Sequence, residues 1–152
     1  MADQRGRPRV LFLCTGNSCR SQMAEGWARS LLDSDIDACS AGVDPNKLNT
    51  LAVKVMDEAG IDISAHESKA IDACEPDTID LVVTVCGHAD ETCPTFPGKT
   101  TIVHRPFDDP PKLAADAKSE DEALPIYRRV RDEIKSFVEG LPALLREHGL
   151  QQ

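Results

Sequence analysis

An eight-residue loop near the N-terminus, residues 14–21 with the sequence CTGNSCRS, constrains this chain more than any other feature. The loop directly follows the apolar run 10–13, and a helical pattern of apolar side chains follows the loop. A buried strand is therefore expected to end in a tight polar loop that opens a helix. The backbone N–H groups at a helix start and the helix dipole both favour an anion, so we expect the loop to bind one.

Two residues of this loop carry chemistry. Cys14 begins the loop and Arg20 closes it, which gives the spacing Cys-x5-Arg. A helix N-terminus and a nearby arginine both lower the pKa of a thiol, so Cys14 is expected to act as a thiolate nucleophile, with Ser21 able to hydrogen-bond to it. The Arg20 guanidinium can bind two oxygens of a tetrahedral anion. The alternative is a buried structural cysteine, but strand, loop, arginine and helix together favour the nucleophile.

Length and composition restrict the class of protein. The chain has 152 residues, and we expect a flexible tail over residues 1–8 and a single domain over residues 9–147. A net charge of −9 makes nucleic acid and anionic membranes poor partners. No apolar run approaches the roughly 20 residues of a membrane span, and residues 1–9 lack the apolar part of a signal peptide, so a cytoplasmic protein is expected. In that compartment the six cysteines are not expected to form structural disulfides.

The rest of the chain alternates strand and helix patterns. We expect strands at 9–13, 36–40, 81–85 and 100–103, helices at 21–33, 48–59 and 124–145 with a kink at Pro142, and a rigid loop at 107–111. Strands that alternate with helices imply right-handed crossovers and a parallel sheet. The sequence therefore predicts a single-domain α/β fold, with a four-stranded parallel sheet flanked by helices.

Two further residues are expected beside Cys14 at the carboxyl edge of this sheet, where ligands bind in such folds. Cys86 follows the third expected strand, as Cys14 follows the first, and Asp109 follows the fourth by several residues. Asp109 precedes a proline and can serve as a general acid; Asp108 is the competing candidate, and an ordinary surface turn is the alternative.

Cys86 and Cys93 flank a polar stretch and suggest a disulfide switch. In a helix they would lie about 10 Å apart along the axis, whereas a disulfide needs Cα atoms within roughly 7 Å. The segment between them would have to loop or unwind to form the bond. Two unrelated thiols are the alternative.

Taken together, these motifs resemble the low-molecular-weight tyrosine phosphatase fold and, more closely, the thioredoxin-coupled arsenate reductase family. The resemblance runs from Val10 to about Phe137. It rests on the loop 14–26 (CTGNSCRSQMAEG), on Ser40-Ala41-Gly42, on Val82-Val83-Thr84-Val85-Cys86 followed by Cys93-Pro94, on Phe107-Asp108-Asp109-Pro110, and on the stretch 128–134 (RRVRDEI).

The resemblance implies a role for each matching residue. Cys14 would be the nucleophile, Arg20 the oxyanion clamp and Asp109 the general acid, while Cys86 would be the second thiol and Cys93 the resolving thiol delivered to thioredoxin. The oxyanion would be bound by the loop residues Thr15, Gly16, Asn17, Ser18, Cys19, Arg20 and Ser21. Reduction of As(V) to As(III) takes two electrons, which two thiols supply when they form one disulfide. The implied partners are arsenate, arsenite and thioredoxin, with phosphate or sulfate as mimics, and we expect a monomer.

Some members of that family hold a monovalent cation near the loop. The residues here that match its ligands are Asn17, Glu25 and Ser40, but Lys69 stands where those members have a fourth ligand, an aspartate. Because an ammonium group cannot ligate a cation but can replace its charge, no potassium site is expected, and no metal or other cofactor. The remaining cysteines have simpler interpretations: Cys19 packs in the loop, where an off-path bond to Cys14 is conceivable, Cys39 lies in the core, and Cys74 is partly exposed.

Two rival functions stay open at this point. A tyrosine phosphatase of the same fold would place aromatic residues after the acid, but residues 110–112 are Pro-Pro-Lys, and Cys86 and Cys93 would have no purpose. An arsenate reductase can also have a weak phosphatase side activity, because phosphate and arsenate share shape and charge. A zinc- or arsenite-binding protein would use Cys14, Cys19, Cys86 and Cys93, but zinc sites favour two to four residues between paired cysteines, and here the gaps are four and six.

Overall fold

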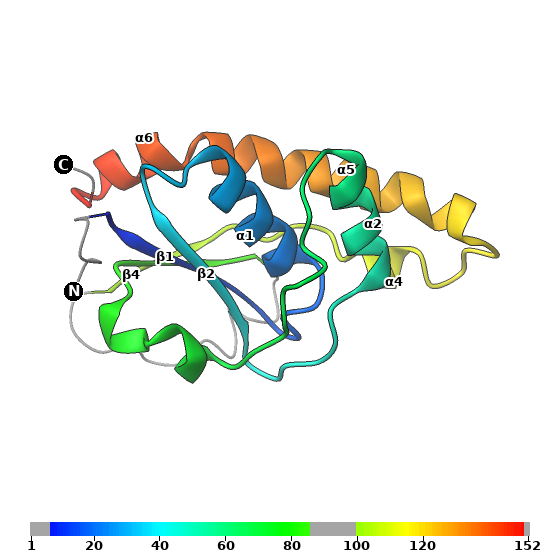
Figure 1. Ribbon diagram of the computed structural model, residues 1–152, viewed down its shortest axis with the longest axis horizontal. Helices are drawn as coiled ribbons and strands as arrows, with labels where there is room; N and C mark the ends of the chain where they lie inside the picture. Colours follow the sequence, from blue (N-terminus) through cyan, green and yellow to red (C-terminus); the bar gives the residue numbers. More distant parts are fainter. Residues whose placement is uncertain (1–6, 86–99, 151–152) are drawn as a thin grey trace.

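The centre of the molecule is a parallel sheet of four strands in the order β2-β1-β3-β4. The computed structural model describes residues 7–85 and 100–150. The strands are β1 (Arg9–Cys14), β2 (Asp37–Gly42), β3 (Leu81–Thr84) and β4 (Thr101–His104). The predicted four-stranded parallel sheet is therefore confirmed, and each strand lies within two residues of its expected bounds. The first crossover runs from β1 through α1 (Arg20–Leu31) to β2 at the edge (Figure 1).

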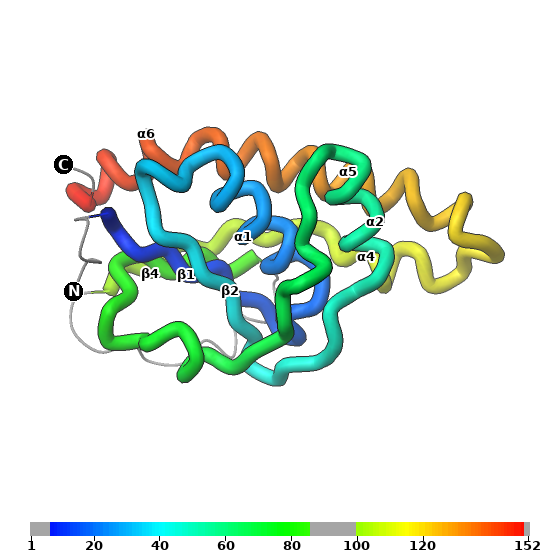
Figure 2. Tube along the Cα trace, in the orientation of Figure 1, coloured from blue at the N-terminus to red at the C-terminus, as the bar shows by residue number. Residues whose placement is uncertain are grey.

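Helices cover one side of this sheet. α1 packs against β1 and β2, and α5 (Glu120–Glu139) lies along α1 and α2 (Thr50–Glu58). The short α4 (Pro110–Leu113) precedes α5 in the chain, and α6 (Leu141–Glu147) follows α5 near the C-terminus. The two 3-10 turns η1 (Ile71–Cys74) and η2 (Pro76–Thr78) lie on the other side of the sheet, below it in Figure 2.

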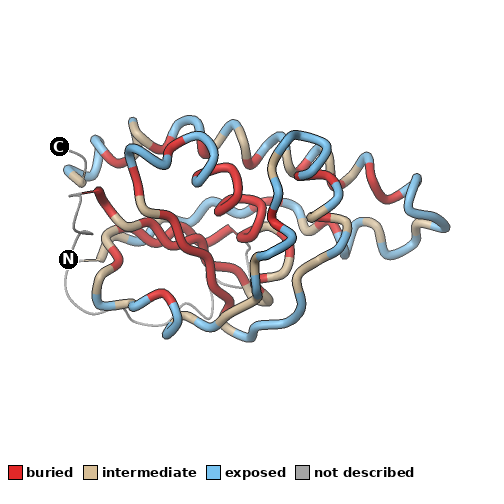
Figure 3. The backbone as a smooth tube through the Cα atoms, viewed as in Figure 1, coloured by how far each residue is buried: buried red, intermediate tan, exposed pale blue. Residues whose placement is uncertain are grey.

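Apolar strands explain where the core lies. Residues 10–14 of β1 and all four residues of β3 are buried, as expected for central strands that are covered on both faces. Eight consecutive residues of α1, from Ser21 to Ala28, are also buried, which makes this helix the main cover of the sheet (Figure 3). The loop 14–21 therefore joins a buried central strand to the buried part of the helix that covers it, and its ends are fixed by packing.

The C-terminal segment differs from the expected single helix. It consists of α5 and α6, with the break at Gly140 and not at Pro142. Pro142 lies in the first turn of α6, where a missing N–H costs nothing. In the loop expected over residues 107–111, a helical turn already begins at Pro110 for the same reason, so Asp109 is the residue directly before that turn.

A disulfide joins Cys39 of β2 to Cys74 of η1, with the two Cα atoms 6.3 Å apart. The expectation that no cysteine forms a structural disulfide was therefore wrong, and so was the expected partial exposure of Cys74, which is buried. The cause is a contact that the sequence does not show. Ala70 forms an isolated parallel bridge with Gly42, and this bridge places η1 beside the edge strand.

Two further observations concern the ends of the domain and membrane insertion. Arg7 and Pro8, which were expected in the N-terminal tail, are buried, and Arg7 donates hydrogen bonds to the Asp33 and Ile36 carbonyls. Among the described residues, no helix has the length and apolar character needed to cross a membrane.

Candidate active site

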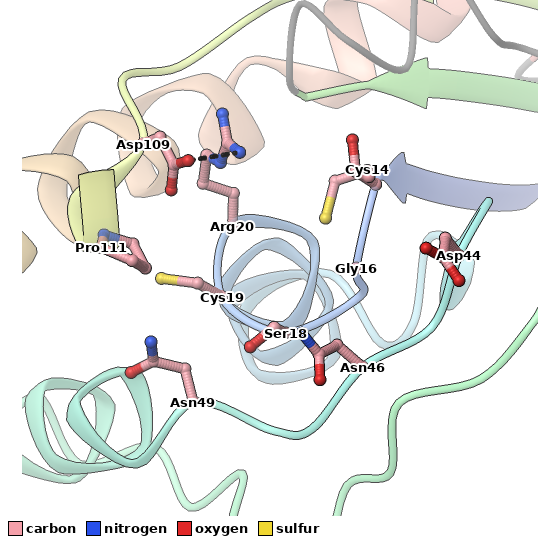
Figure 4. A pocket seen from close by; sticks show the side chains of 11 residues that line it. Cys14, Gly16, Ser18, Cys19, Arg20, Asp44, Asn46, Asn49, Asp109 and Pro111 are labelled. Atoms are coloured by element: carbon pink, nitrogen blue, oxygen red, sulfur yellow. Dashed lines mark ion pairs between the residues drawn. The ribbon is translucent and has the colours of Figure 1, made fainter. Parts of the chain in front are cut away.

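A pocket of about 450 Å³ opens at the carboxyl edge of the sheet, directly over the loop 14–21 (Figure 4). Its lining comes from three segments: the loop itself, the segment after β2, and the residues around the start of α4. The lining residues are Cys14, Thr15, Gly16, Ser18, Cys19, Arg20, Asp44, Asn46, Asn49, Asp109 and Pro111. The structure thus brings the predicted acid to one pocket with most of the predicted loop residues, whereas Asn17 and Ser21 are fully buried and do not line it.

Cys14 is the last residue of β1 and is buried at the base of this pocket. Its Sγ lies 3.1 Å from Oγ of Ser21, which is itself fully buried in the first turn of α1. Ser21 also accepts a hydrogen bond of 2.9 Å from Nδ2 of Asn17. Because Asn17 already donates to this oxygen, the Ser21 hydroxyl proton is available for the sulfur of Cys14. A thiolate at Cys14 would be stabilised by this hydroxyl, the hydrogen bond that the sequence predicted.

Arg20 is the first residue of α1, and its guanidinium lies between Asp109 and Cys14 in the view of Figure 4. Nη1 donates to the Phe107 carbonyl at 3.0 Å, and Nη2 lies 3.6 Å from Oδ2 of Asp109. These contacts come from the loop before α4, so the loop that carries the acid also orients the arginine. The remaining N–H donors of the fork are placed to bind an oxyanion in the pocket.

The structure separates the two candidate acids. Asp109 lines the pocket, whereas the neighbouring Asp108 is exposed and forms an ion pair of 3.1 Å with Arg129 of α5. Asp109 directly precedes Pro110, and the residue before a proline is restricted to extended backbone, which Asp109 adopts with φ −91° and ψ 103°. This geometry favours Asp109 over Asp108 as the general acid.

Cys19 is a second thiol on the pocket wall, and its side chain points toward Pro111 (Figure 4). It is almost fully buried, and this burial raises the pKa of Cys19 to about 12, with a partly opposing effect of the Arg20 charge. A thiol with this pKa is neutral at physiological pH. The predicted structural role of Cys19, as a side chain packed in the loop, therefore agrees with the structure.

The backbone of the loop is arranged so that its carbonyl groups face away from the pocket. The carbonyls of Thr15, Gly16 and Ser18 accept hydrogen bonds from the backbone of the segment after β2. The Asn17 carbonyl accepts from Nε2 of Gln22 and from Oγ of Ser68. In a trans peptide the N–H of the next residue points the opposite way, so the N–H groups of residues 16–19 are directed to the pocket side.

Asn17 holds this loop in an unusual backbone conformation. Its φ is +49°, in the left-handed region, which asparagine tolerates better than most residues. Its side chain is fully buried, and Oδ1 accepts from Nε2 of Gln22 and from the backbone N–H of Lys69. The side chain therefore fixes the loop to two neighbouring segments. This role was not foreseen from the sequence, although an asparagine inside a tight loop is a known sign of positive φ.

An ionic cluster surrounds the buried carboxylate of Glu25, one of the residues that resemble cation ligands. Oε1 of Glu25 accepts from Oγ of Ser40 at 2.6 Å and lies 3.5 Å from Nζ of Lys69. Oε2 pairs with Arg29 at 2.8 Å and lies 3.8 Å from Nδ1 of His66. Burial lowers the pKa of His66 despite the Glu25 charge, which acts in the opposite direction. The Lys69 ammonium thus stands beside the carboxylate that the resemblance assigned to the cation.

Some predicted site residues lie outside the described part of the chain. Cys86 and Cys93 belong to residues 86–99, so their predicted roles are not tested here. Asp44, Asn46, Asn49 and Pro111 line the pocket but were not singled out as site residues. Asp44 and Asn46 follow β2, and their position after a strand of a parallel sheet was the signal that could have found them.

The fold and the pocket together define a class, that of α/β proteins that bring a cysteine, an arginine and a carboxylate to one pocket at the carboxyl edge of a parallel sheet. The sequence matches the low molecular weight phosphotyrosine protein phosphatase family over residues 9–151. The arsenate reductase of Halalkalibacterium halodurans is 48% identical over 134 residues, which cover 86% of this chain and 94% of that protein. The arsenate reductase of Bacillus subtilis is 47% identical, again over 86% of this chain and 94% of that protein.

Solved structures give the same result. An arsenate reductase in the phosphate binding state superimposes with a TM-score of 0.72 at 34% identity, covering 90% of this chain and 97% of that one. A low molecular weight protein tyrosine phosphatase from T. tengcongensis superimposes with a TM-score of 0.71 at 30% identity, covering 91% and 99%. This chain belongs to the low molecular weight phosphotyrosine protein phosphatase family and, within it, to the arsenate reductases.

Proposed function

We propose that this protein reduces arsenate to arsenite with three of its cysteines and that thioredoxin supplies the electrons. The observation that carries the proposal is the shared pocket of Cys14, Arg20 and Asp109, in a chain closely related to arsenate reductases. In a phosphatase, these three groups would suffice. The two additional cysteines Cys86 and Cys93 are what a reductase needs and a phosphatase does not.

The first half of the reaction uses the pocket. Arg20 and the loop N–H groups bind arsenate, and the Cys14 thiolate attacks the arsenic. Asp109 gives a proton to the departing oxygen, which leaves as water, and a Cys14–arsenate adduct remains. Ser21 stabilises the thiolate before the attack, since its hydroxyl lies 3.1 Å from the sulfur.

The second half transfers the electrons. Cys86 attacks the sulfur of Cys14, the electron pair of the S–As bond passes to arsenic, and arsenite leaves as a Cys14–Cys86 disulfide forms. Cys93 then attacks Cys86, which frees Cys14 and leaves a Cys86–Cys93 disulfide. A thioredoxin dithiol reduces that bond and becomes a disulfide itself. The two electrons that arsenic gains are thus the two that thioredoxin loses.

The setting of the protein follows from this cycle. Thioredoxin reduction takes place in the cytoplasm, so we place the enzyme there, and we propose that it acts as a monomer. Residues 9–147 form the single catalytic domain in this proposal. Arsenate is the substrate, and phosphate and sulfate are mimics that bind the same loop because they are tetrahedral oxyanions of similar size.

The test is NADPH consumption in the presence of arsenate, thioredoxin and thioredoxin reductase. Wild type should consume NADPH steadily, whereas Cys93→Ser should stop after about one turnover and accumulate a Cys14–Cys86 disulfide. The double variant Cys39→Ala, Cys74→Ala is the control, because it lacks the Cys39–Cys74 disulfide, whose residues do not line the pocket. This variant should consume NADPH steadily, as wild type does. If NADPH consumption does not depend on arsenate, and aryl phosphate hydrolysis survives Cys86→Ser and Cys93→Ser, the protein would instead be assigned to the phosphatases.

A further inference from the structure

The segment that follows β2 runs alongside the oxyanion loop and is hydrogen-bonded to it at four positions. The backbone N–H groups of Val43, Asp44, Asn46 and Asn49 donate to the carbonyls of Cys14, Thr15, Gly16 and Ser18, at 3.2, 2.8, 2.8 and 3.0 Å. Residues 43–49, called the backing segment here, thus hold these carbonyls away from the pocket. The orientation of the loop N–H groups depends on how closely the backing segment approaches the loop.

Gly42 lies at the point of closest approach. A Cβ atom at this position would lie 2.7 Å from the Thr15 carbonyl oxygen, 2.8 Å from the Asn17 nitrogen and 3.0 Å from the Gly16 carbonyl carbon. All three are backbone atoms of the oxyanion loop. Unlike the tip of a side chain, they cannot move aside without moving the loop.

Gly42 itself cannot retreat from the loop. It pairs with Cys14 at the end of the β1–β2 ladder, and its N–H donates to the Lys69 carbonyl at 2.8 Å. On its outer side it forms the bridge to Ala70, and η1 is tied to β2 by the Cys39–Cys74 disulfide. A side chain at residue 42 would therefore displace the oxyanion loop and not the strand.

We infer that Gly42 is a positioning residue for oxyanion binding. Because residue 42 has no side chain, the loop 14–21 can pack directly against it, and this contact sets the distance between the loop and the backing segment. This role deepens the proposed function, and the part of its test that measures arsenate reduction rests on that function. Gly42 touches neither the anion nor the sulfur, and it acts through the backbone of Thr15, Gly16 and Asn17. This role is one of shape and differs from the conformational role of a glycine with positive φ.

The test compares Gly42→Ala with two alanine controls. At Gly26 the three atoms nearest to a Cβ all belong to side chains, those of Ile63 at 2.8 Å, Met56 at 3.0 Å and Ile61 at 3.3 Å, so Gly26→Ala reports general strain in the core. At Gly140 the nearest atom is the Phe137 carbonyl oxygen at 3.5 Å, an ordinary contact. The readouts are the phosphate concentration that protects Cys14 from alkylation, the KM and kcat for arsenate, and the thermal midpoint.

In Gly42→Ala, the protecting phosphate concentration and the KM for arsenate should each rise about 10- to 100-fold, by more than kcat falls, because a loop shift below 1 Å misplaces several donors together. Gly140→Ala should match wild type. Gly26→Ala should lower the thermal midpoint without changing phosphate protection. The inference is overturned if Gly42→Ala folds and protects Cys14 at the wild-type phosphate concentration, or if Gly26→Ala weakens protection as much.

A second variant covers the case in which Gly42→Ala does not fold. Asn46→Pro removes the N–H that donates to the Gly16 carbonyl, at an exposed position. Lys47→Pro places the same ring one residue later, where the described hydrogen bonds include none from the backbone N–H. Weaker phosphate protection is expected in Asn46→Pro only, and equal protection in both variants would contradict the role of the backing segment.

Phosphate protection also separates the two proposals. It requires only an oxyanion and the Cys14 thiol, so it reports on Gly42 even if no arsenate is reduced. Wild type that is protected by phosphate but does not reduce arsenate would refute the proposed function and leave the inference testable. Arsenate reduction with an unchanged KM in folded Gly42→Ala would refute the inference alone.

Discussion

Nη2 of Arg20 lies 3.6 Å from Oδ2 of Asp109, so the anion clamp and the candidate acid form an ion pair on the pocket wall. One residue begins α1, and the other precedes α4. Because Arg20 also donates to the Phe107 carbonyl, the acid loop and the arginine hold each other in place. An oxyanion bound by Arg20 would thereby lie next to the carboxyl group that we propose as the general acid.

This pairing predicts that Asp109→Asn loses activity while retaining anion binding. The amide keeps the size of the carboxylate but cannot donate a catalytic proton, so kcat should fall by about 10²- to 10⁴-fold. Asp108→Asn is the matched control, because Asp108 is exposed and pairs with Arg129 outside the pocket. The measurement is kcat for arsenate in both variants. A larger loss of kcat in Asp108→Asn would show that Asp108 is the general acid.

Much of the site was predictable because its residues are adjacent in sequence. Cys14, Arg20 and Ser21 lie in one loop between a strand and a helix, and the carboxyl-edge rule places Asp109 near them. The contacts of the backing segment and of Asn17 were not predictable, because they join Asp44 to Thr15 and Asn17 to Lys69 across the fold. The Cys39–Cys74 bond was missed for the same reason. Local patterns in the chain do not specify such lateral contacts between an edge strand and a loop.

The two thiols of the pocket should differ in reactivity. Since burial raises the pKa of Cys19 to about 12, this thiol is neutral between pH 6 and 9 and should resist iodoacetamide. Cys14 should be alkylated under native conditions, and phosphate should protect it. Mass spectrometry of peptides from the reduced, native protein measures both residues in one experiment. Rapid labelling of Cys19 before unfolding would show that its thiol is not buried as described.

The Cys39–Cys74 disulfide should stabilise the fold. It closes a loop over a sequence separation of 35 residues, for which chain entropy predicts about 3 to 4 kcal/mol of unfolding free energy. The guanidinium midpoint of wild type should therefore fall when reductant is added. The double variant Cys39→Ala, Cys74→Ala should unfold near the reduced midpoint and show no response to reductant. An identical wild-type midpoint with and without reductant would count against the bond.

Lys69 should make the protein indifferent to potassium. Its ammonium lies 3.5 Å from the buried Glu25 carboxylate and supplies the positive charge that a cation would otherwise bring. Activity and thermal midpoint should be equal in potassium chloride and in tetramethylammonium chloride at the same ionic strength. Lys69→Met should be less stable by about 1 to 3 kcal/mol, because the buried Glu25 carboxylate loses one of its charged partners.

The surface pair of Lys54 and Glu120 provides the control for this prediction. Both side chains are about half exposed, so Lys54→Met should leave the midpoint nearly unchanged. If potassium raises the midpoint of Lys69→Met but not that of wild type, the lysine replaces a cation charge. A potassium response in wild type would exclude that role.

His66 should make stability depend on pH in a defined direction. Burial lowers its pKa below the ordinary value of 6.5, so the unfolded chain binds more protons than the folded one just below pH 6.5. The stability associated with neutral His66 is therefore complete above about pH 6.5 and decreases as pH falls toward the lowered pKa. The thermal midpoint, measured from pH 5 to 8, should be flat in the upper half of this range and decline in the lower half.

The variant His66→Gln isolates this contribution from that of the carboxylates. Nδ1 of His66 lies 3.0 Å from Oε1 of Gln22, and an amide can donate the same hydrogen bond without titrating. The decline between pH 6.5 and 5 should be smaller in His66→Gln than in wild type. His148→Gln, at an exposed position near the C-terminus, should retain the full wild-type decline. A decline of equal size in all three proteins would mean that groups other than His66 cause it.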